Sequence, residues 1–74
     1  MTALSDLAAG TDCEVVEIRS GSSGAERALA YGLTPGARLR LHQRWPAYVI
    51  QIGETDLAFD TDIARSIFVR VIDE

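Results

Sequence analysis

The chain has 74 residues, of which 47% are hydrophobic, and a formal net charge of −4 at pH 7. This length allows one domain without a deep active-site cleft, because a chain this short buries only about 60% of its unfolded surface. The acidic balance excludes generic nucleic-acid binding, which needs a net basic surface.

Three further features concern the compartment. The single cysteine permits no internal disulfide, which fits a reducing environment. No apolar run approaches the roughly 20 residues that span a bilayer. The first residues, Met1–Asp6, lack the basic region and apolar core of a signal peptide. We therefore expect a cytoplasmic protein that is not embedded in a membrane.

The first ten residues predict a short helical turn. Leu4 and Leu7 are spaced i, i+3, so one turn of helix places both side chains on the same side, where they can press onto a core. Gly10-Thr11-Asp12 then predicts a turn into the first strand.

The segment Cys13–Arg19 is rich in β-branched residues and predicts the first strand. Its alternation is imperfect, because Val15 and Val16 are adjacent apolar residues. A β-bulge at this pair lets both Val15 and Ile18 point inward.

A short helix with a defined start and stop is predicted next. Ser23 and Glu26 have the spacing of a capping box, in which each side chain bonds the other residue's backbone N–H. Gly32 stands where a helix ends in a left-handed residue. Pro35 and Gly36 predict a turn, because proline presets φ and glycine accepts positive φ.

The segment Ala37–Arg44 alternates cleanly and predicts a half-buried strand. Its apolar residues are expected to face the core: Ala37, Leu39 and Leu41. Its polar residues are expected to face outward: Arg38, Arg40, His42 and Arg44.

The remaining chain predicts three more strands and a helical turn. In order these are a strand Tyr48–Ile52, a hairpin turn Gly53–Asp56, a strand Leu57–Phe59, a capped turn Asp60–Ala64, and a strand Ile67–Ile72 with Ile67, Val69 and Val71 inward. Five short strands, one helix after the first strand and a helical turn before the last match a small, partly open β-barrel. Residues 1–74 are therefore expected to form one mainly β domain without repeats.

The sequence contains few candidates for catalytic residues or metal ligands. Only His42 and Cys13 are borderline or soft ligands, and no ligand spacing accompanies them, so they are weak candidates for a transition metal. A hard-cation site at Asp56, Asp60 and Asp62 competes with turn and capping roles. We expect no catalytic residue, no cofactor, and at most weak or adventitious divalent metal binding.

The best surface candidate follows the arginine-rich strand. Arginine and aromatic residues are enriched at interface hot spots. The predicted partner-binding residues are Arg38, Arg40, Arg44, Trp45 and Tyr48. The alternative is a solvated strand face with Trp45 folded over the mouth of the barrel.

Three motifs carry a family resemblance. The opening Leu4-Ser5-Asp6-Leu7-Ala8-Ala9-Gly10, the central Gly32-Leu33-Thr34-Pro35-Gly36 and the closing Ala64-Arg65-Ser66-Ile67-Phe68-Val69 stand in this order. Together they resemble the FeoA family of small cytosolic proteins of bacterial ferrous iron uptake. The same type of domain occurs at the C-terminus of DtxR-type metal-dependent repressors.

The resemblance implies a small barrel like a Src-homology-3 (SH3) domain, with a binding role and no catalysis. It implies the cytosolic part of the ferrous iron transporter FeoB as partner, and no particular oligomeric state. Asp60 after Phe59 and Ile63 before Ala64 depart from the FeoA pattern. They leave a second interpretation open, a stand-alone relative of the repressor C-terminal domain with a regulatory partner.

Overall fold

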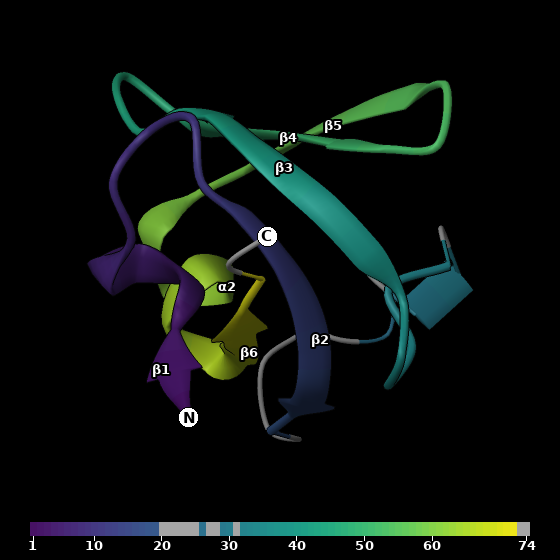
Figure 1. The fold of residues 1–74 in the computed structure, drawn as a ribbon. Coiled ribbons are helices and arrows are strands. Elements are labelled where there is room, and N and C mark those ends of the chain that lie inside the picture. The colour runs from purple at the N-terminus through teal and green to yellow at the C-terminus, as the bar shows by residue number, and fades with distance from the viewer. Residues whose placement is uncertain (20–25, 27–28, 31, 73–74) are drawn as a thin grey trace.

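The fold is a single curled antiparallel sheet (Figure 1). The computed structural model describes residues 1–19, 26, 29–30 and 32–72. Six strands lie in the order β1-β6-β2-β3-β4-β5. Their bounds are β1 Thr2–Ala3, β2 Asp12–Ile18, β3 Arg38–Gln43, β4 Tyr48–Ile52, β5 Thr55–Phe59 and β6 Ile67–Val71.

Two short helical elements lie beside the β1–β6 end of the sheet (Figure 1). The 3-10 helix η1 spans Leu4–Asp6, and the α-helix α2 spans Thr61–Ser66. Leu4 and Leu7 are both buried, as their spacing predicts. The Asp60 carboxylate accepts a hydrogen bond from the Ile63 N–H at 2.9 Å and caps α2. The predicted turn through Ala64 is thus correct, although the helix continues to Ser66.

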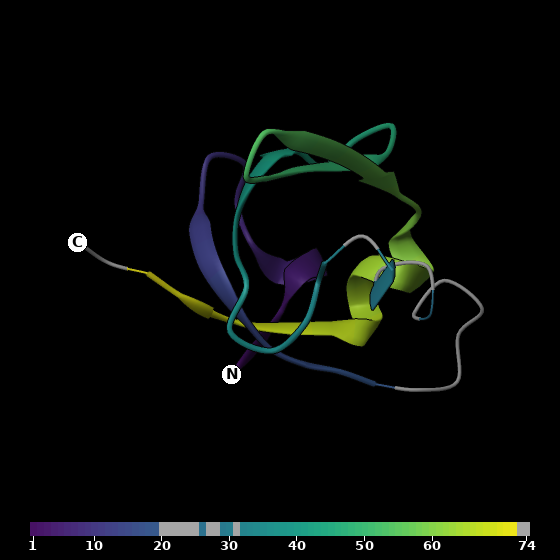
Figure 2. The same ribbon diagram turned by 90° about the vertical axis from the view of Figure 1, so that its right-hand side faces the viewer.

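The sheet curls round on itself (Figure 2). The buried apolar side chains of the described residues form one core cluster. The described residues include no buried polar or charged side chain. The largest fully buried side chains come from η1, the chain after Gly32, and strands β2, β3, β4 and β6: Leu4, Leu33, Leu41, Ile50, Ile67, Val15, Val69 and Cys13.

The bulge predicted in the first strand is present. Along β2, Val15 pairs with Val69 but Glu17 pairs with Phe68, so the register shifts between them. The extra residue, Val16, is 40% exposed. Val15 is buried, and Ile18 packs partly buried against the core. A β-bulge therefore resolves the two adjacent valines.

The helix stop and the following turn are also confirmed. Gly32 has φ +95°, and its N–H donates to the Leu29 carbonyl at 3.1 Å. Gly36 has φ +93° and forms a turn together with Pro35, closed by the hydrogen bond from the Ala37 N–H to the Thr34 carbonyl at 2.9 Å. Glu26 is helical, whereas Ser23, the other half of the predicted capping box, lies outside the described residues.

Three details differ from the sequence-based expectations. The short strand β1 was not expected; it adds a sixth strand by pairing with β6. The hairpin turn consists of Gly53 and Glu54, so Thr55 and Asp56 belong to β5. Positive φ at Gly53 alone, +60°, fits a type II′ turn.

The third difference is Val71, expected to be inward but 44% exposed. It lies at the end of β6, where the chain runs out past the body of the domain (Figure 2). Its parity along the strand is that of buried Val69. Strand β1, however, pairs with β6 only at Phe68 and Val69, so among the described residues no strand flanks Val71 on that side.

Candidate interaction surface

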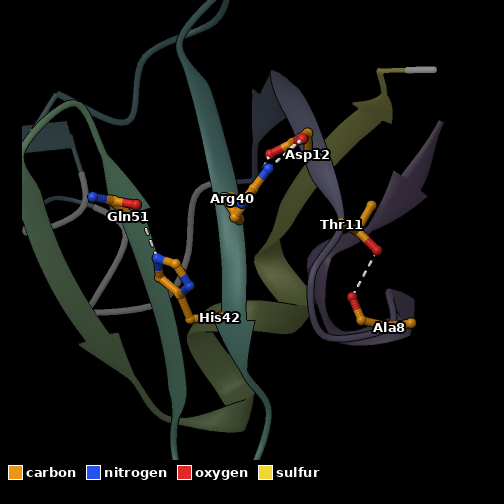
Figure 3. Close-up of polar contacts among 6 residues, drawn as sticks. All are labelled: Ala8, Thr11, Asp12, Arg40, His42 and Gln51. Carbon is orange, nitrogen blue, oxygen red and sulfur yellow. Dashed lines mark hydrogen bonds and ion pairs between the residues drawn. The ribbon is translucent and has the colours of Figure 1, made fainter. Parts of the chain in front are cut away.

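The outer face of β3 carries a bidentate ion pair with the neighbouring strand. Arg40 lies opposite Asp12 of β2. Its Nε and Nη2 donate to Asp12 Oδ1 and Oδ2 at 2.8 and 3.0 Å (Figure 3). This hydrogen bonding, with the charge of the guanidinium, lowers the pKa of Asp12 and raises that of Arg40, outweighing slight desolvation. Both side chains remain about half exposed, so solvent screens the pair.

A shallow hollow of about 500 Å³ lies beside this ion pair. Its lining comes from β2, β3, β4, the hairpin turn and the end of β6: Asp12, Arg38, Leu39, Arg40, Gln51, Gly53 and Ile72. Arg40 uses two of its guanidinium donors to bond Asp12, so this side chain already has a partner on the neighbouring strand. The hollow is a mainly polar depression of the sheet surface, and one of its two arginines is already paired with Asp12.

The side chain of His42 is exposed and points toward β4, whereas that of Arg40 points toward β2. Its Nε2 lies 3.0 Å from Gln51 Oε1 on β4 (Figure 3). Cys13 is buried on the inner face, and burial raises the pKa of its thiol to about 11. The two weak metal candidates therefore lie on opposite faces of the sheet, and the thiol stays protonated near neutral pH. Across the described residues, no group of three or more histidine, cysteine and carboxylate side chains converges.

The three aspartates after the hairpin do not converge either. Asp60 caps α2, and Asp62 lies 3.9 Å from Arg65 within that helix. Asp56 projects from β5 as an exposed side chain. Capping and surface roles thus account for them better than a hard-cation site.

A second bulge divides the predicted arginine stripe. Leu41 pairs with Ile50 but Gln43 pairs with Val49, so His42 is the extra residue of β3. A bulge of one residue reverses the faces of the residues that follow. The expectation that Arg44 shares the outer face of Arg38 and Arg40 is therefore wrong.

Arg44 instead turns toward the N-terminal segment. Its Nη2 donates to the Ser5 carbonyl of η1 at 2.9 Å, and its guanidinium lies 6.0 Å from the centre of the Tyr48 ring. The Tyr48 hydroxyl donates to the same carbonyl at 3.3 Å. Tyr48 is only 6% exposed, so its ring belongs to the core and not to the predicted docking surface.

Trp45 follows directly and is 83% exposed. The alternative in which it folds over the barrel mouth is therefore wrong. The segment 44–47, hereafter the Trp45 loop, connects β3 to β4. The Arg44 side chain ties the loop to η1. Gln43 Nε2 donates to the Ala47 carbonyl at 3.2 Å, which joins the residue before the loop to the last residue of the loop. Ser5, a partner through its backbone carbonyl, carried no sequence signal because every residue has that group.

Comparison with known families identifies the domain. A family model described as the FeoA domain matches residues 2–71. The chain belongs to the FeoA domain family. The three motifs therefore identified the family correctly. A comparison with curated protein sequences gave no significant match.

Solved structures share this FeoA fold. An iron uptake regulatory protein named FeoA is 27% identical, with a TM-score of 0.84 and 95% of each chain covered. A Stenotrophomonas maltophilia FeoA in complex with zinc, described as a prokaryotic SH3 domain protein, is 22% identical with TM-score 0.82, covering 95% of this chain and 91% of that one. T. acidophilum IdeR is 18% identical with TM-score 0.88, covering 96% of this chain but 34% of that one.

These likenesses confirm the SH3-like fold and its relation to both FeoA proteins and metal-dependent regulators. In the described part of the chain, no helix has the length and apolar character to cross a bilayer.

Proposed function

We propose that this FeoA domain is a non-enzymatic, cytoplasmic protein-interaction module that supports or regulates the ferrous iron transporter FeoB by docking on its cytosolic part. Membership of the FeoA domain family supports the link to ferrous iron transport. The observation that carries a docking role is Trp45, 83% exposed on a loop tied down on both sides.

The Trp45 loop has the properties of an interface anchor. A large aromatic side chain contributes most when a partner covers it completely, and tryptophan and arginine are the residues most enriched at hot spots. The hydrogen bond from Arg44 to Ser5 limits the freedom that the loop loses on binding. In this proposal Trp45 enters an apolar pocket of the partner, and Arg44 holds the loop in place.

Calorimetric titration of the intact domain with the cytosolic domain of FeoB tests the proposal. We expect saturable binding that Trp45→Ala weakens at least about thirtyfold, which corresponds to about 2 kcal/mol. Val71→Ala is the matched control, because Val71 is also an exposed apolar side chain but lies at the end of β6. Absence of binding by the wild-type domain, or equal losses in both variants, contradicts the proposal.

A second candidate is a stand-alone relative of the DtxR-type C-terminal domain with a regulatory partner. The structural likeness to IdeR supports it, at the level of the fold. The same titration separates the two candidates. Binding to a metal-dependent repressor, with none to the FeoB domain, favours the second.

We also propose that the domain works without a resident metal or cofactor. The separation of His42 and Cys13 onto opposite faces supports this. Titration of the reduced protein with Zn²⁺ and with Fe²⁺ is expected to show weak binding or none. Tight stoichiometric binding that His42→Ala or Cys13→Ser abolishes contradicts it.

A further inference from the structure

The sheet ends at β5, whose outer edge no other described strand covers. β5 has five residues, whereas the strand at the opposite edge, β1, has two and continues directly into η1. In Figure 1 the β4–β5 hairpin projects at the upper right, away from α2 and β6. A strand edge of this kind can accept an extended segment of another chain.

The hairpin register shows which backbone groups point outward. Ile52 and Thr55 flank the turn and pair across it, so they form a hydrogen-bonded pair. Pairing alternates along an antiparallel ladder, so Leu57 and Phe59 also direct their backbone groups to β4. The N–H and C=O of Asp56 and Ala58 therefore face away from the sheet.

The side chains beside this edge are acidic or small. Asp56 and Ala58 are exposed, and exposed Glu54 and Asp60 lie just before and just after the strand. No described residue forms an ion pair with Glu54 or Asp56. An incoming strand therefore meets uncompensated negative charge.

This charge argues against a second copy of the chain as the occupant. In antiparallel self-pairing, Asp56 of one copy lies opposite Ala58, Asp56 or Asp60 of the other. The first arrangement also sets Glu54 opposite Asp60, so every arrangement opposes two carboxylates. Like charges directly opposite each other destabilise a ladder. Edge charges are a common barrier to self-association.

We propose that the β5 edge is a second docking site, which takes an extended, basic segment of a partner protein as an additional antiparallel strand. The backbone groups of Asp56 and Ala58 provide the ladder hydrogen bonds. The exposed carboxylates of Glu54 and Asp56 select lysine or arginine at alternate positions of the segment, whereas the Asp60 carboxylate caps α2. This site differs from the Trp45 loop, because it is the outer edge of β5, whereas the loop connects β3 to β4.

The test uses the intact domain and a synthetic peptide of alternating lysine and valine, followed by NMR with amide hydrogen exchange. Bound peptide should slow exchange at Asp56 and Ala58, while Leu57 and Phe59, already bonded to β4, should change little. Asp56→Lys should lower the affinity for the lysine peptide about tenfold or more and raise the affinity for the matched glutamate peptide. Ala58→Pro, which removes an outward N–H, should abolish protection at the edge.

Several outcomes would overturn the proposal. Chemical-shift changes without slowed exchange at Asp56 and Ala58 would show electrostatic attraction alone. Equal binding of the lysine and glutamate peptides would remove the role of charge. Slowed exchange at these amides in peptide-free protein, rising with concentration, would assign the edge to a second copy. Thermal unfolding of Asp56→Lys checks that this variant keeps its fold, and none of these readouts depends on FeoB.

Discussion

The two halves of the predicted arginine surface have different fates in the structure. On β3, Arg40 is engaged in a bidentate pair with Asp12, and the segment forms part of the sheet. Beyond the bulge at His42, Arg44 leaves the sheet face to hold η1, and Trp45 projects into solvent. Before the bulge, an arginine therefore links two strands of the sheet. After the bulge, an arginine anchors a loop that exposes a tryptophan.

The comparison shows that residue type alone does not locate a docking surface. An arginine whose Nε and Nη2 already bond a carboxylate has fewer donors left for a partner, whereas an exposed tryptophan on an anchored loop gives up only water. We therefore propose that the interaction surface is the Trp45 loop.

The largest effect is expected from the inner face of β3. Leu41 is fully buried, so Leu41→Ala should lower the free energy of unfolding by about 2–5 kcal/mol. Trp45→Ala removes a larger side chain but should change it by less than about 0.5 kcal/mol. Chemical denaturation of both variants checks this contrast. A Trp45→Ala variant as unstable as Leu41→Ala would place the tryptophan in the core.

An intermediate effect is expected from the anchor of the loop. Arg44→Ala removes the hydrogen bond to the Ser5 carbonyl and should destabilise the domain by about 1 kcal/mol, because the Tyr48 hydroxyl still satisfies that acceptor. Its clearer consequence is greater mobility of Trp45, measurable as lower fluorescence anisotropy of this single tryptophan. Unchanged anisotropy would mean that Arg44 does not restrain the loop.

The smallest effect is expected from the exposed pair on the sheet. The pKa of Asp12 lies below its ordinary value of 3.8, so the pair contributes stability above that pH and loses it as the pH falls through the folded-state pKa. In Arg40→Ala the Asp12 pKa should rise toward 3.8, by NMR titration of the carboxyl carbon. The shift should shrink with added salt. An Asp12 pKa that is the same in both proteins would contradict the pairing.

Most of the fold was predictable because its signals are local and repeated. The adjacent Val15 and Val16 predicted the first bulge because they break the alternation of the strand. Gly32 predicted the end of the helix because that position requires a positive φ. The second bulge left no such mark. His42 and Arg44 both fit the alternation of β3, so the change of face came only from pairing with β4.

The candidate surface was predictable only in part. Trp45 was identified by residue type. The anchoring of its loop was not, because Arg44 bonds the Ser5 carbonyl, which gives no sequence signal. Tyr48 was predicted to be a docking residue, but its side chain is only 6% exposed and packs in the core. Strand β1, two residues long, is too short to show any periodicity.

The most direct test of the central claim uses the single tryptophan itself. The domain is labelled with 5-fluorotryptophan, and its ¹⁹F NMR signal is followed during titration with the cytosolic domain of FeoB. We predict that the signal shifts, broadens and loses its sensitivity to exchange of H₂O for D₂O as the partner covers Trp45. Binding that saturates by calorimetry while the ¹⁹F signal keeps its position and its solvent sensitivity would contradict docking through the Trp45 loop.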